Sequence, residues 1–320
     1  MTFFEPTDSA SLTDAFPNLP FGLRHNFAGS PLLTVPRLAE LVRELPRDRI
    51  EYNSGKAAIS QDPDKTPMVD LDPEEIVRKI ESAGAWMVLK HVETHPAYGK
   101  LINDALLEVA RTRGHHNLKD AGFEDIRGFI FVSSAQSTTP FHADSDENFF
   151  FQIHGDKYFH VYDNRDRSIA SEQALEDVVV KHRNIPYDDR FDAKSTTYTL
   201  HPGEGVFVPY QWPHWVRTAG SYSISLSLTW KSAEVRRRND IFTVNSMLRS
   251  IGIPQQSPGV SPLLDNAKVA VFRTANGAVA PLRRSEAMRR MLRRIAFGRR
   301  ANYYYKAGAK KAQDETAKAS

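Results

Sequence analysis

The sequence of 320 residues contains no cysteine. Disulfide bridges, thiolate metal sites and cysteine nucleophiles are therefore excluded. No stretch approaches the roughly 18 uninterrupted apolar residues of a membrane-spanning helix, so we expect no membrane span. The first twenty residues have neither a basic region nor an apolar core, which argues against a secretory signal. We therefore expect a cytoplasmic protein.

Positive charge is concentrated at one end of the chain. The net charge is +3, but residues 283–320 carry twelve Lys or Arg against three acidic residues. That tail has a net charge of +9, so the remaining residues sum to −6. Apolar residues make up 41% and charged residues 25%, as in an ordinary soluble globular protein. The pattern predicts a mildly acidic body with a basic tail.

Residues 139–163 hold the strongest chemical signal in the sequence. His142 and Asp144 lie two positions apart and are followed by an aromatic segment, a Gly-Asp turn and a second β-like segment. Side chains at i and i+2 of an extended chain point to the same side, so both can reach one metal ion. A third ligand must come from elsewhere, and His214 is the best candidate.

Two histidines and one carboxylate on one face of an ion form the facial triad of non-haem Fe(II) oxygenases. A His-x-acid triplet alone is weak, since about one is expected by chance in a chain of this composition. The interpretation as a metal site therefore depends on the residues around the triplet. Thr139 lies three positions before His142, and Lys157 lies fifteen positions after it.

These motifs resemble the Jumonji-C oxygenases, and most closely the asparaginyl hydroxylase branch that inhibits the hypoxia-inducible factor. The resemblance is specific over residues 128–230 and loose over residues 20–250. The matching positions are Thr139-Pro140, His142-x-Asp144, Asn148-Phe149-Phe150, Gln152-Ile153-x-Gly155-x-Lys157 and Pro209-x-x-Trp212-x-His214.

The resemblance implies a mainly β fold with helical additions. We expect a double-stranded β-helix, the jelly-roll barrel of cupins and Jumonji-C proteins, with N-terminal helices and a C-terminal helical segment. It implies Fe(II) held by His142, Asp144 and His214, and 2-oxoglutarate as co-substrate. The implied activity is hydroxylation of a C–H bond, with a peptide or protein side chain as substrate.

Four further residues are implied to serve the co-substrate. Lys157 and Thr139 would hold its distal carboxylate, since an unpaired charge inside a barrel is costly. Asn148 would lie near the metal and the oxygen site, and Trp230 would form an aromatic wall. One departure is Leu228, where the family has an asparagine that lines the pocket.

Hydrophobic periodicity and turn residues divide the chain into elements. We predict an irregular arm at 1–30 and a catalytic domain at 31–232. A C-terminal helical region is expected at 233–300, and a basic disordered tail at 301–320. Loops are expected at 46–70 and 252–282. The predicted helices are 36–45, 72–82, 96–112, 235–251 and 284–297. The predicted strands are 85–91, 128–134, 148–154, 157–163, 196–200, 205–208 and 221–230.

Two other functions are open. A cupin enzyme with Zn or Mn would use the same barrel, but it carries His-x-His where this chain has His142-x-Asp144. A non-catalytic regulator could bind nucleic acid through the basic tail. For the C-terminal helices, pairing in a homodimer is the competing interpretation.

Overall fold

The computed structural model describes residues 3, 9–61, 66–67, 69–279 and 291. The chain forms two compact units. The first comprises residues 1–169 and 184–233, and the second comprises residues 170–183 and 234–320. The domain boundaries expected from the sequence stay a prediction.

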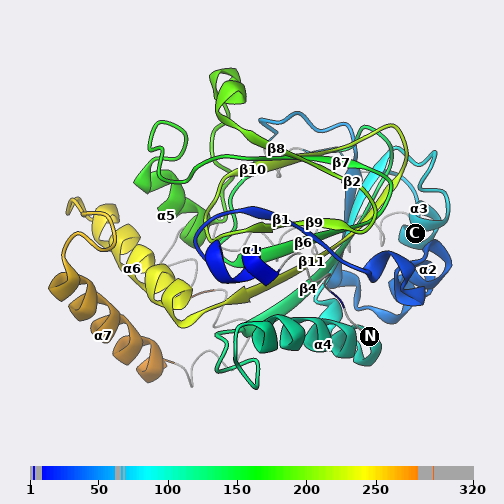
Figure 1. Ribbon diagram of the computed structural model, residues 1–320. Coiled ribbons are helices and arrows are strands. Elements are labelled where there is room, and N and C mark those ends of the chain that lie inside the picture. The colour runs from blue at the N-terminus through cyan, green and yellow to red at the C-terminus, as the bar shows by residue number, and fades with distance from the viewer. Residues whose placement is uncertain (1–2, 4–8, 62–65, 68, 280–290, 292–320) are drawn as a thin grey trace. The chain divides into compact units, whose positions relative to one another are not determined.

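The first unit contains two antiparallel sheets (Figure 1). The larger has seven strands in the order β1-β9-β6-β11-β4-β3-β2, and the smaller has four in the order β5-β10-β7-β8. The strands of the larger sheet are β1 (Phe21–Arg24), β2 (Ile50–Ser54), β3 (Ala85–Lys90), β4 (Glu124–Ser133), β6 (Glu147–His154), β9 (Glu204–Val208) and β11 (Ser223–Lys231). Those of the smaller are β5 (Thr138–His142), β7 (Lys157–Val161), β8 (Thr196–Leu200) and β10 (His214–Thr218).

An apolar cluster joins the inner faces of the two sheets. Phe150, Val206 and Val208 of the larger sheet pack with Phe159 and Val216 of the smaller one. The sheets therefore enclose a barrel-like interior, which confirms the predicted double-stranded β-helix with helical additions.

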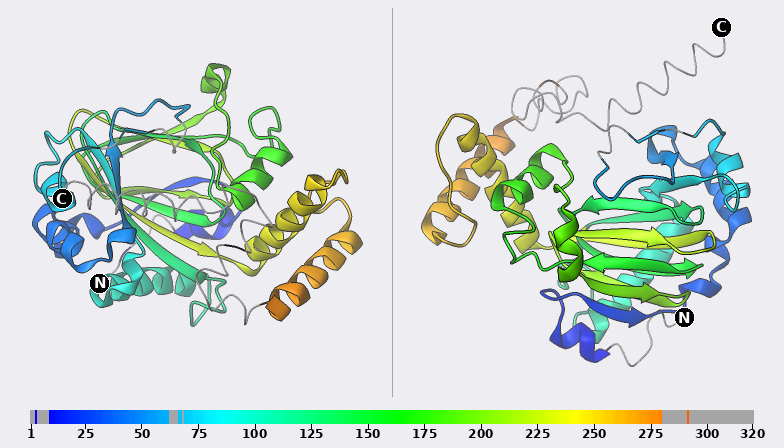
Figure 2. Two further views of the ribbon diagram at one scale, coloured as in Figure 1. Left: turned by 180° about the vertical axis from the view of Figure 1, so that it is seen from behind. Right: turned by 90° about the horizontal axis from the view of Figure 1, so that it is seen from above.

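The outer face of the larger sheet carries the main core. It packs against the amphipathic helices α2 (Val35–Glu44) and α4 (Pro96–Thr112) and the shorter α3 (Pro73–Arg78) (Figure 2). All three lie where periodicity predicts helices. Asp72 caps α3 as expected, because its carboxylate accepts a hydrogen bond of 2.9 Å from the Glu74 amide.

Successive side chains of strand β11 point alternately into the outer apolar core and into the interior between the two sheets. Leu226, Leu228 and Trp230 belong to the outer core. The alternate positions all carry small hydroxyl side chains, and Phe150, the β6 neighbour of Ser227, belongs to the inner apolar cluster. The hydroxyl residues are Ser223, Ser225, Ser227 and Thr229, and none is more than 5% exposed.

Two expected irregular segments contain regular structure. The arm at 1–30 includes α1 (Ser9–Asp14) and β1, and the loop at 46–70 includes β2. Both strands lie at the edges of the larger sheet, where β1 pairs with β9 and β2 with β3. The prediction was wrong because these short strands are stabilised by partners far along the chain, and local pattern does not reveal them.

The strands that carry the two candidate histidines were also not predicted. β5 contains Pro140, which discourages a strand assignment, but β5 is the edge of its sheet and its proline needs no ladder partner on the outer side. β10 begins directly after Pro213 and has only five residues. Both strands pair with each other, and β10 also pairs with β7.

The second unit is helical. Its helices are α5 (Glu172–Lys181), α6 (Ala233–Ser250) and α7 (Pro262–Val279). An ion pair of 3.2 Å from Arg249 to Glu176 joins α6 to α5, and one of 2.8 Å from Arg273 to Asp240 joins α7 to α6. None of the described helices is long and apolar enough to cross a membrane.

The predicted helix at 235–251 corresponds to α6. The prediction of a loop at 252–282 was wrong, because this segment contains α7. Its prolines and glycines suggested a break. Pro262, however, occupies the first turn of α7, where a missing N–H removes no hydrogen bond. The predicted helix at 284–297 and the basic tail lie outside the described residues.

Candidate metal centre and co-substrate pocket

Three of the predicted site residues converge at one end of the smaller sheet. His142, at the end of β5, pairs directly with His214, at the start of β10, and their rings lie 4.2 Å apart. The Asp144 carboxylate lies 3.9 Å from His142 Nε2 and 3.8 Å from His214 Nε2. One candidate ligand atom of each residue lies within 4.8 Å of the others.

Backbone carbonyls fix both imidazole rings. His142 Nδ1 lies 2.7 Å from the Pro140 carbonyl, and His214 Nδ1 lies 2.9 Å from the Trp212 carbonyl. The protonated nitrogen of each ring is thereby Nδ1, which leaves Nε2 with its lone pair toward Asp144. Burial, followed by the nearby His142, lowers the pKa of His214 well below 6.5. A neutral imidazole is the form that binds a metal.

The loop that carries Asp144 is held at two points. The Gln211 amide donates a hydrogen bond of 3.1 Å to the Asp144 carbonyl. Lys231, at the end of β11, forms an ion pair of 3.2 Å with Asp146. The loop is therefore anchored to the segment between β9 and β10 and to the end of β11.

The donor set fits a divalent transition metal. Two ligand atoms that each lie about 2.1 Å from an ion can be at most about 4.2 Å apart. The carboxylate oxygen nearest each imidazole is within that limit, because Oδ1 lies 3.9 Å from His142 Nε2 and Oδ2 lies 3.8 Å from His214 Nε2. Two neutral imidazoles and one carboxylate on one side of an ion suit Fe(II) and leave coordination positions for other ligands.

Lys157 lies deeper, on β7, and points inward. Its side chain is 2% exposed, and its ammonium lies 5.3 Å from the Phe150 ring centroid and 5.8 Å from that of Phe131. Within the described part of the chain, no hydrogen bond or ion pair reaches this ammonium. Burial lowers the pKa of Lys157 to about 7. A buried cation without an internal partner indicates a site for an anionic group.

Thr139 and Asn148 also face this interior. Trp86 Nε1 donates a hydrogen bond of 3.0 Å to Thr139 Oγ1, so the Thr139 hydroxyl proton remains available to a ligand. Asn148, at the start of β6, is 5% exposed and accepts a hydrogen bond of 2.7 Å from Ser227. Ser227 was not identified from the sequence, although the alternating hydroxyl residues at 223–229 indicate a polar face.

Trp230 does not lie with the other candidates, and the prediction of a pocket wall at this position needs correction. Its ring packs in the outer core against Phe149, at 5.0 Å, and Phe123, at 4.9 Å. Leu228 lies on the same outer face, so its difference from asparagine changes the core and leaves pocket polarity untouched. The physical reason is strand alternation, which sends neighbouring residues to opposite faces.

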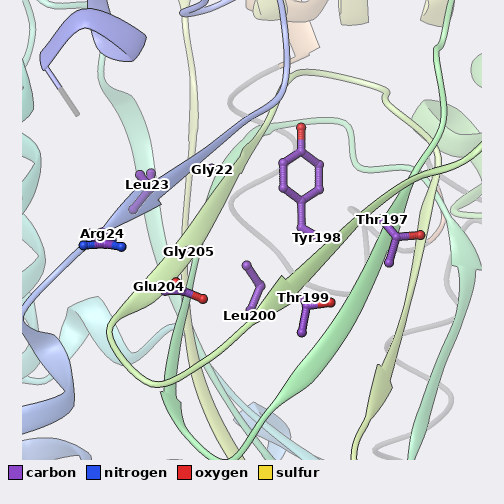
Figure 3. Close-up of a pocket in the computed structure, with 9 residues that line it drawn as sticks. All are labelled: Gly22, Leu23, Arg24, Thr197, Tyr198, Thr199, Leu200, Glu204 and Gly205. Carbon is purple, nitrogen blue, oxygen red and sulfur yellow. The ribbon is translucent and has the colours of Figure 1, made fainter. Parts of the chain in front are cut away.

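A surface hollow of about 390 Å³ lies elsewhere in the first unit. Its lining comes from β1, β8 and the start of β9 (Figure 3). Tyr198 extends into it between Gly22 and Thr197. None of the candidate metal or co-substrate residues lines it.

The fold and the two-histidine, one-carboxylate cluster define a cupin-type metal protein. A family model described as the cupin-like domain matches residues 42–234, more than half of the chain. The protein belongs to the cupin-like domain family. The expected Jumonji-C or cupin-like fold is thereby confirmed, whereas the closeness to the asparaginyl hydroxylase branch stays a prediction.

Two curated proteins are similar to parts of the chain. The HSPB1-associated protein 1 homolog of Danio rerio is 27% identical over 158 residues, which cover 46% of this chain and 34% of that protein. Lysine-specific demethylase 8 of Xenopus tropicalis is 30% identical over 125 residues, which cover 35% and 27%. The chain thus spans about a third or less of the length of these relatives.

Among solved structures, Escherichia coli YcfD is similar at 16% identity and a TM-score of 0.48, covering 88% of this chain and 70% of that one. A second structure of YcfD, described as a ribosomal oxygenase in complex with cobalt and 2-oxoglutarate, is similar at 14% identity and a TM-score of 0.44, covering 87% and 68%.

Proposed function

We propose that this protein is an Fe(II)- and 2-oxoglutarate-dependent dioxygenase that hydroxylates a C–H bond. The observation that carries the proposal is the cluster of His142, Asp144 and His214 at the end of the interior that also holds the unpartnered, buried Lys157. A metal site alone would fit many cupins. The inward lysine adds a requirement for an anionic ligand, which a keto diacid meets.

Each residue has a separate task in this proposal. The three ligands hold Fe(II), which supplies the redox chemistry with oxygen when bound. Lys157 pairs with the distal carboxylate of 2-oxoglutarate, and the Thr139 hydroxyl donates to the same group. The surrounding aromatic side chains Phe131 and Phe150 exclude water, which strengthens that ion pair.

The experiment is conversion of 2-oxoglutarate to succinate with and without added Fe(II). We expect His142→Ala or Asp144→Ala to abolish succinate formation and leave the fold intact. His160→Ala is the matched control, because His160 stacks on Trp215, with 3.9 Å between ring centroids, on the outer face of the smaller sheet. Unchanged turnover in either ligand variant would refute the metal assignment.

We propose a peptide or protein side chain as the substrate. The resemblance of residues 128–230 to Jumonji-C oxygenases supports this, and so does similarity to a protein whose name describes demethylation of lysine. Mass spectrometry of cellular proteins, with and without the active enzyme, tests it through the gain of one oxygen atom.

A homodimer formed through the C-terminal helical region is also part of the proposal. Among the described residues of this region, seven large apolar side chains are at least 46% exposed, which is costly in water unless another surface covers them. They are Ile251, Ile253, Val260, Leu263, Leu264, Val271 and Met291.

The alternative is a regulator that binds nucleic acid through its basic tail. Its support is the net charge of +9 over residues 283–320. Salt-dependent DNA binding by the full chain, without any turnover of 2-oxoglutarate, would favour it.

A further inference from the structure

Residues 209–213 form a short turn that links β9 of the larger sheet to β10 of the smaller one. The Trp212 amide donates a hydrogen bond of 3.2 Å to the Pro209 carbonyl and thereby closes the turn. At the third position of the turn, Gln211 has a φ of +60°, whereas Tyr210 before it has no positive φ. This is the backbone of a type II turn, in which glycine or asparagine is the usual third residue.

Gln211 is unusual among the described non-glycine residues with a positive φ, because its side chain is only 2% exposed. The others, at half-buried or exposed positions, are His91, Asp125, Gln136 and His182. The left-handed region is unfavourable for L residues because Cβ crowds the following carbonyl. A residue keeps this conformation only where the surrounding contacts require it, and such residues are common at functional sites.

The peptide group between Tyr210 and Gln211 is hydrogen-bonded on both sides. Its carbonyl accepts a hydrogen bond of 3.2 Å from Asn164 Nδ2, and its N–H donates one of 3.1 Å to the Asp144 carbonyl. A type I turn at the same place, with a negative φ at Gln211, would turn this peptide group over, and both hydrogen bonds would be lost. The left-handed conformation of Gln211 is therefore what directs its N–H toward Asp144.

Asp144 differs from the other two metal candidates in how its side chain is oriented. The rings of His142 and His214 are each fixed by a backbone carbonyl, at 2.7 and 2.9 Å. Among the described residues, no hydrogen bond reaches the Asp144 carboxylate, whose side chain is 35% exposed. The direction of this carboxylate therefore depends on the backbone of Asp144, and the Gln211 amide bonds directly to that backbone.

We infer that Gln211 is a positioning residue for the metal ligand Asp144, and that it acts through its left-handed backbone and not through its side chain. The same turn supplies the Trp212 carbonyl that fixes the His214 ring, so one short segment orients two of the three ligands. The inference rests on the metal site of the proposed function. Residues that adopt a positive φ readily should preserve metal affinity at position 211, and residues that resist it should lower that affinity.

Titration of the chain with Co(II), followed by visible absorption, measures this affinity, since Co(II) follows Fe(II) directly in the affinity order of such sites. We expect Gln211→Val to weaken Co(II) binding by about tenfold, because a β-branched residue resists a positive φ and the hydrogen bond to Asp144 is lost. The ion pair of 3.2 Å between Asp146 and Lys231 still holds the loop, so binding is weakened and not abolished. Gln211→Gly and Gln211→Asn should bind Co(II) like the native protein.

Gln136→Val is the matched control, because Gln136 has the same residue type and nearly the same backbone. Its φ is +59°, and its amide donates a hydrogen bond of 3.0 Å to the Ala219 carbonyl. It lies six residues before His142, beyond the opposite end of β5. We expect Gln136→Val to lower the free energy of unfolding in urea and to leave Co(II) binding unchanged.

Asn164→Ala provides a second variant, which decides the matter if Gln211→Val does not fold. It removes the hydrogen bond to the Tyr210 carbonyl, on the other side of the same peptide group, and leaves the sequence of the turn intact. We expect it to weaken Co(II) binding by about threefold. Native affinity in Gln211→Val, or in Asn164→Ala where Gln211→Val is unfolded, would overturn the inference.

Two further results would also overturn it. An equal loss of affinity in Gln211→Gly and Gln211→Val would assign the effect to the side chain. An equal loss in Gln136→Val and Gln211→Val would assign it to general destabilisation. Failure of the native protein to bind Co(II) or Fe(II) at all would instead overturn the proposed function.

Discussion

At the residue scale, chemistry and packing depend on which face of a strand a side chain occupies. The spacing of His142 and Asp144 indicated a metal site, whereas His214 came from a second motif 72 positions on, and the role of Lys157 was implied by the resemblance to Jumonji-C oxygenases. Trp230 was assigned to the pocket incorrectly, because a shift of one position on a strand moves a side chain to the opposite face. An irregularity in the β11–β4 pairing between Thr229 and Lys231 makes that face hard to infer from spacing.

The buried Lys157 predicts a pH-dependent affinity for 2-oxoglutarate. Burial lowers the pKa of its ammonium to about 7, and a bound carboxylate would raise it again. Above pH 7 the ligand-free lysine is therefore mostly neutral, and binding takes up a proton. We expect the affinity to fall by up to about tenfold per pH unit between pH 7 and the pKa of the complex.

Calorimetry at pH 8, in two buffers with different ionisation enthalpies, measures the protons taken up on binding. Lys157→Ala should take up none and is the control. The same proton uptake in native protein and variant would contradict the role of Lys157.

Glu147 predicts a different pH effect, on stability. Burial raises its pKa to about 7, against a usual 4.5, although the Trp230 indole donates a hydrogen bond to it. The folded protein holds this proton more tightly than the unfolded chain, so the free energy of unfolding falls as pH rises from 4.5 to 7 and stays low above that.

Glu147→Gln removes this charge and should raise the free energy of unfolding at pH 8 by on the order of 2 kcal/mol. At pH 4 both side chains are neutral, and the two proteins should be nearly equal. Urea unfolding at the two pH values measures the difference, and an equal gain at both would disprove the explanation.

At the scale of elements, helices were easier to predict than strands. α2 and α4 contain their own hydrophobic periodicity, so local sequence is sufficient. β1, β2, β5 and β10 have four or five residues each, and their hydrogen bonds go to segments elsewhere in the chain. The motif at the metal cluster was therefore predictable, but the strands that carry its histidines were not.

The hairpin between β6 and β7 turns at Gly155, and this glycine should be required. Its φ is +68°, and an added Cβ would lie 2.2 Å from the Tyr222 carbonyl oxygen. We expect Gly155→Ala to lower the free energy of unfolding by more than about 2 kcal/mol. At Gly220, no atom lies within 4 Å of an added Cβ.

Gly220→Ala is therefore the control, with an expected change of less than about 0.5 kcal/mol. Chemical unfolding of the two variants provides the comparison. Similar losses in both would show that backbone freedom in general, and not the close contact at Gly155, determines the effect.

At the scale of the whole molecule, the exposed apolar residues of the second unit predict self-association. Leu263 and Leu264 of α7 are 84% and 58% exposed. We expect the native chain to be a dimer in solution and the double variant Leu263→Glu, Leu264→Glu to be a monomer, because a charge in an apolar contact loses its hydration.

Light scattering coupled to gel filtration measures the mass of each form. Leu19→Glu is the control, since Leu19 is 44% exposed but belongs to the first unit. A monomeric native chain, or a dimer that persists in the double variant, would contradict this interface.

The pairing of His142 with His214 has a consequence for how iron affects the protein. The two imidazoles are 72 positions apart in the sequence but opposite each other on adjacent strands. An ion bound by both imidazoles would cross-link the two ends of this 72-residue stretch. Because the ion binds only the folded state, its binding free energy would add to the free energy of unfolding. Cells short of iron would then hold a pool of this protein that opens more readily at that seam and is cleared sooner by proteases, so metal supply would govern its lifetime as well as its chemistry.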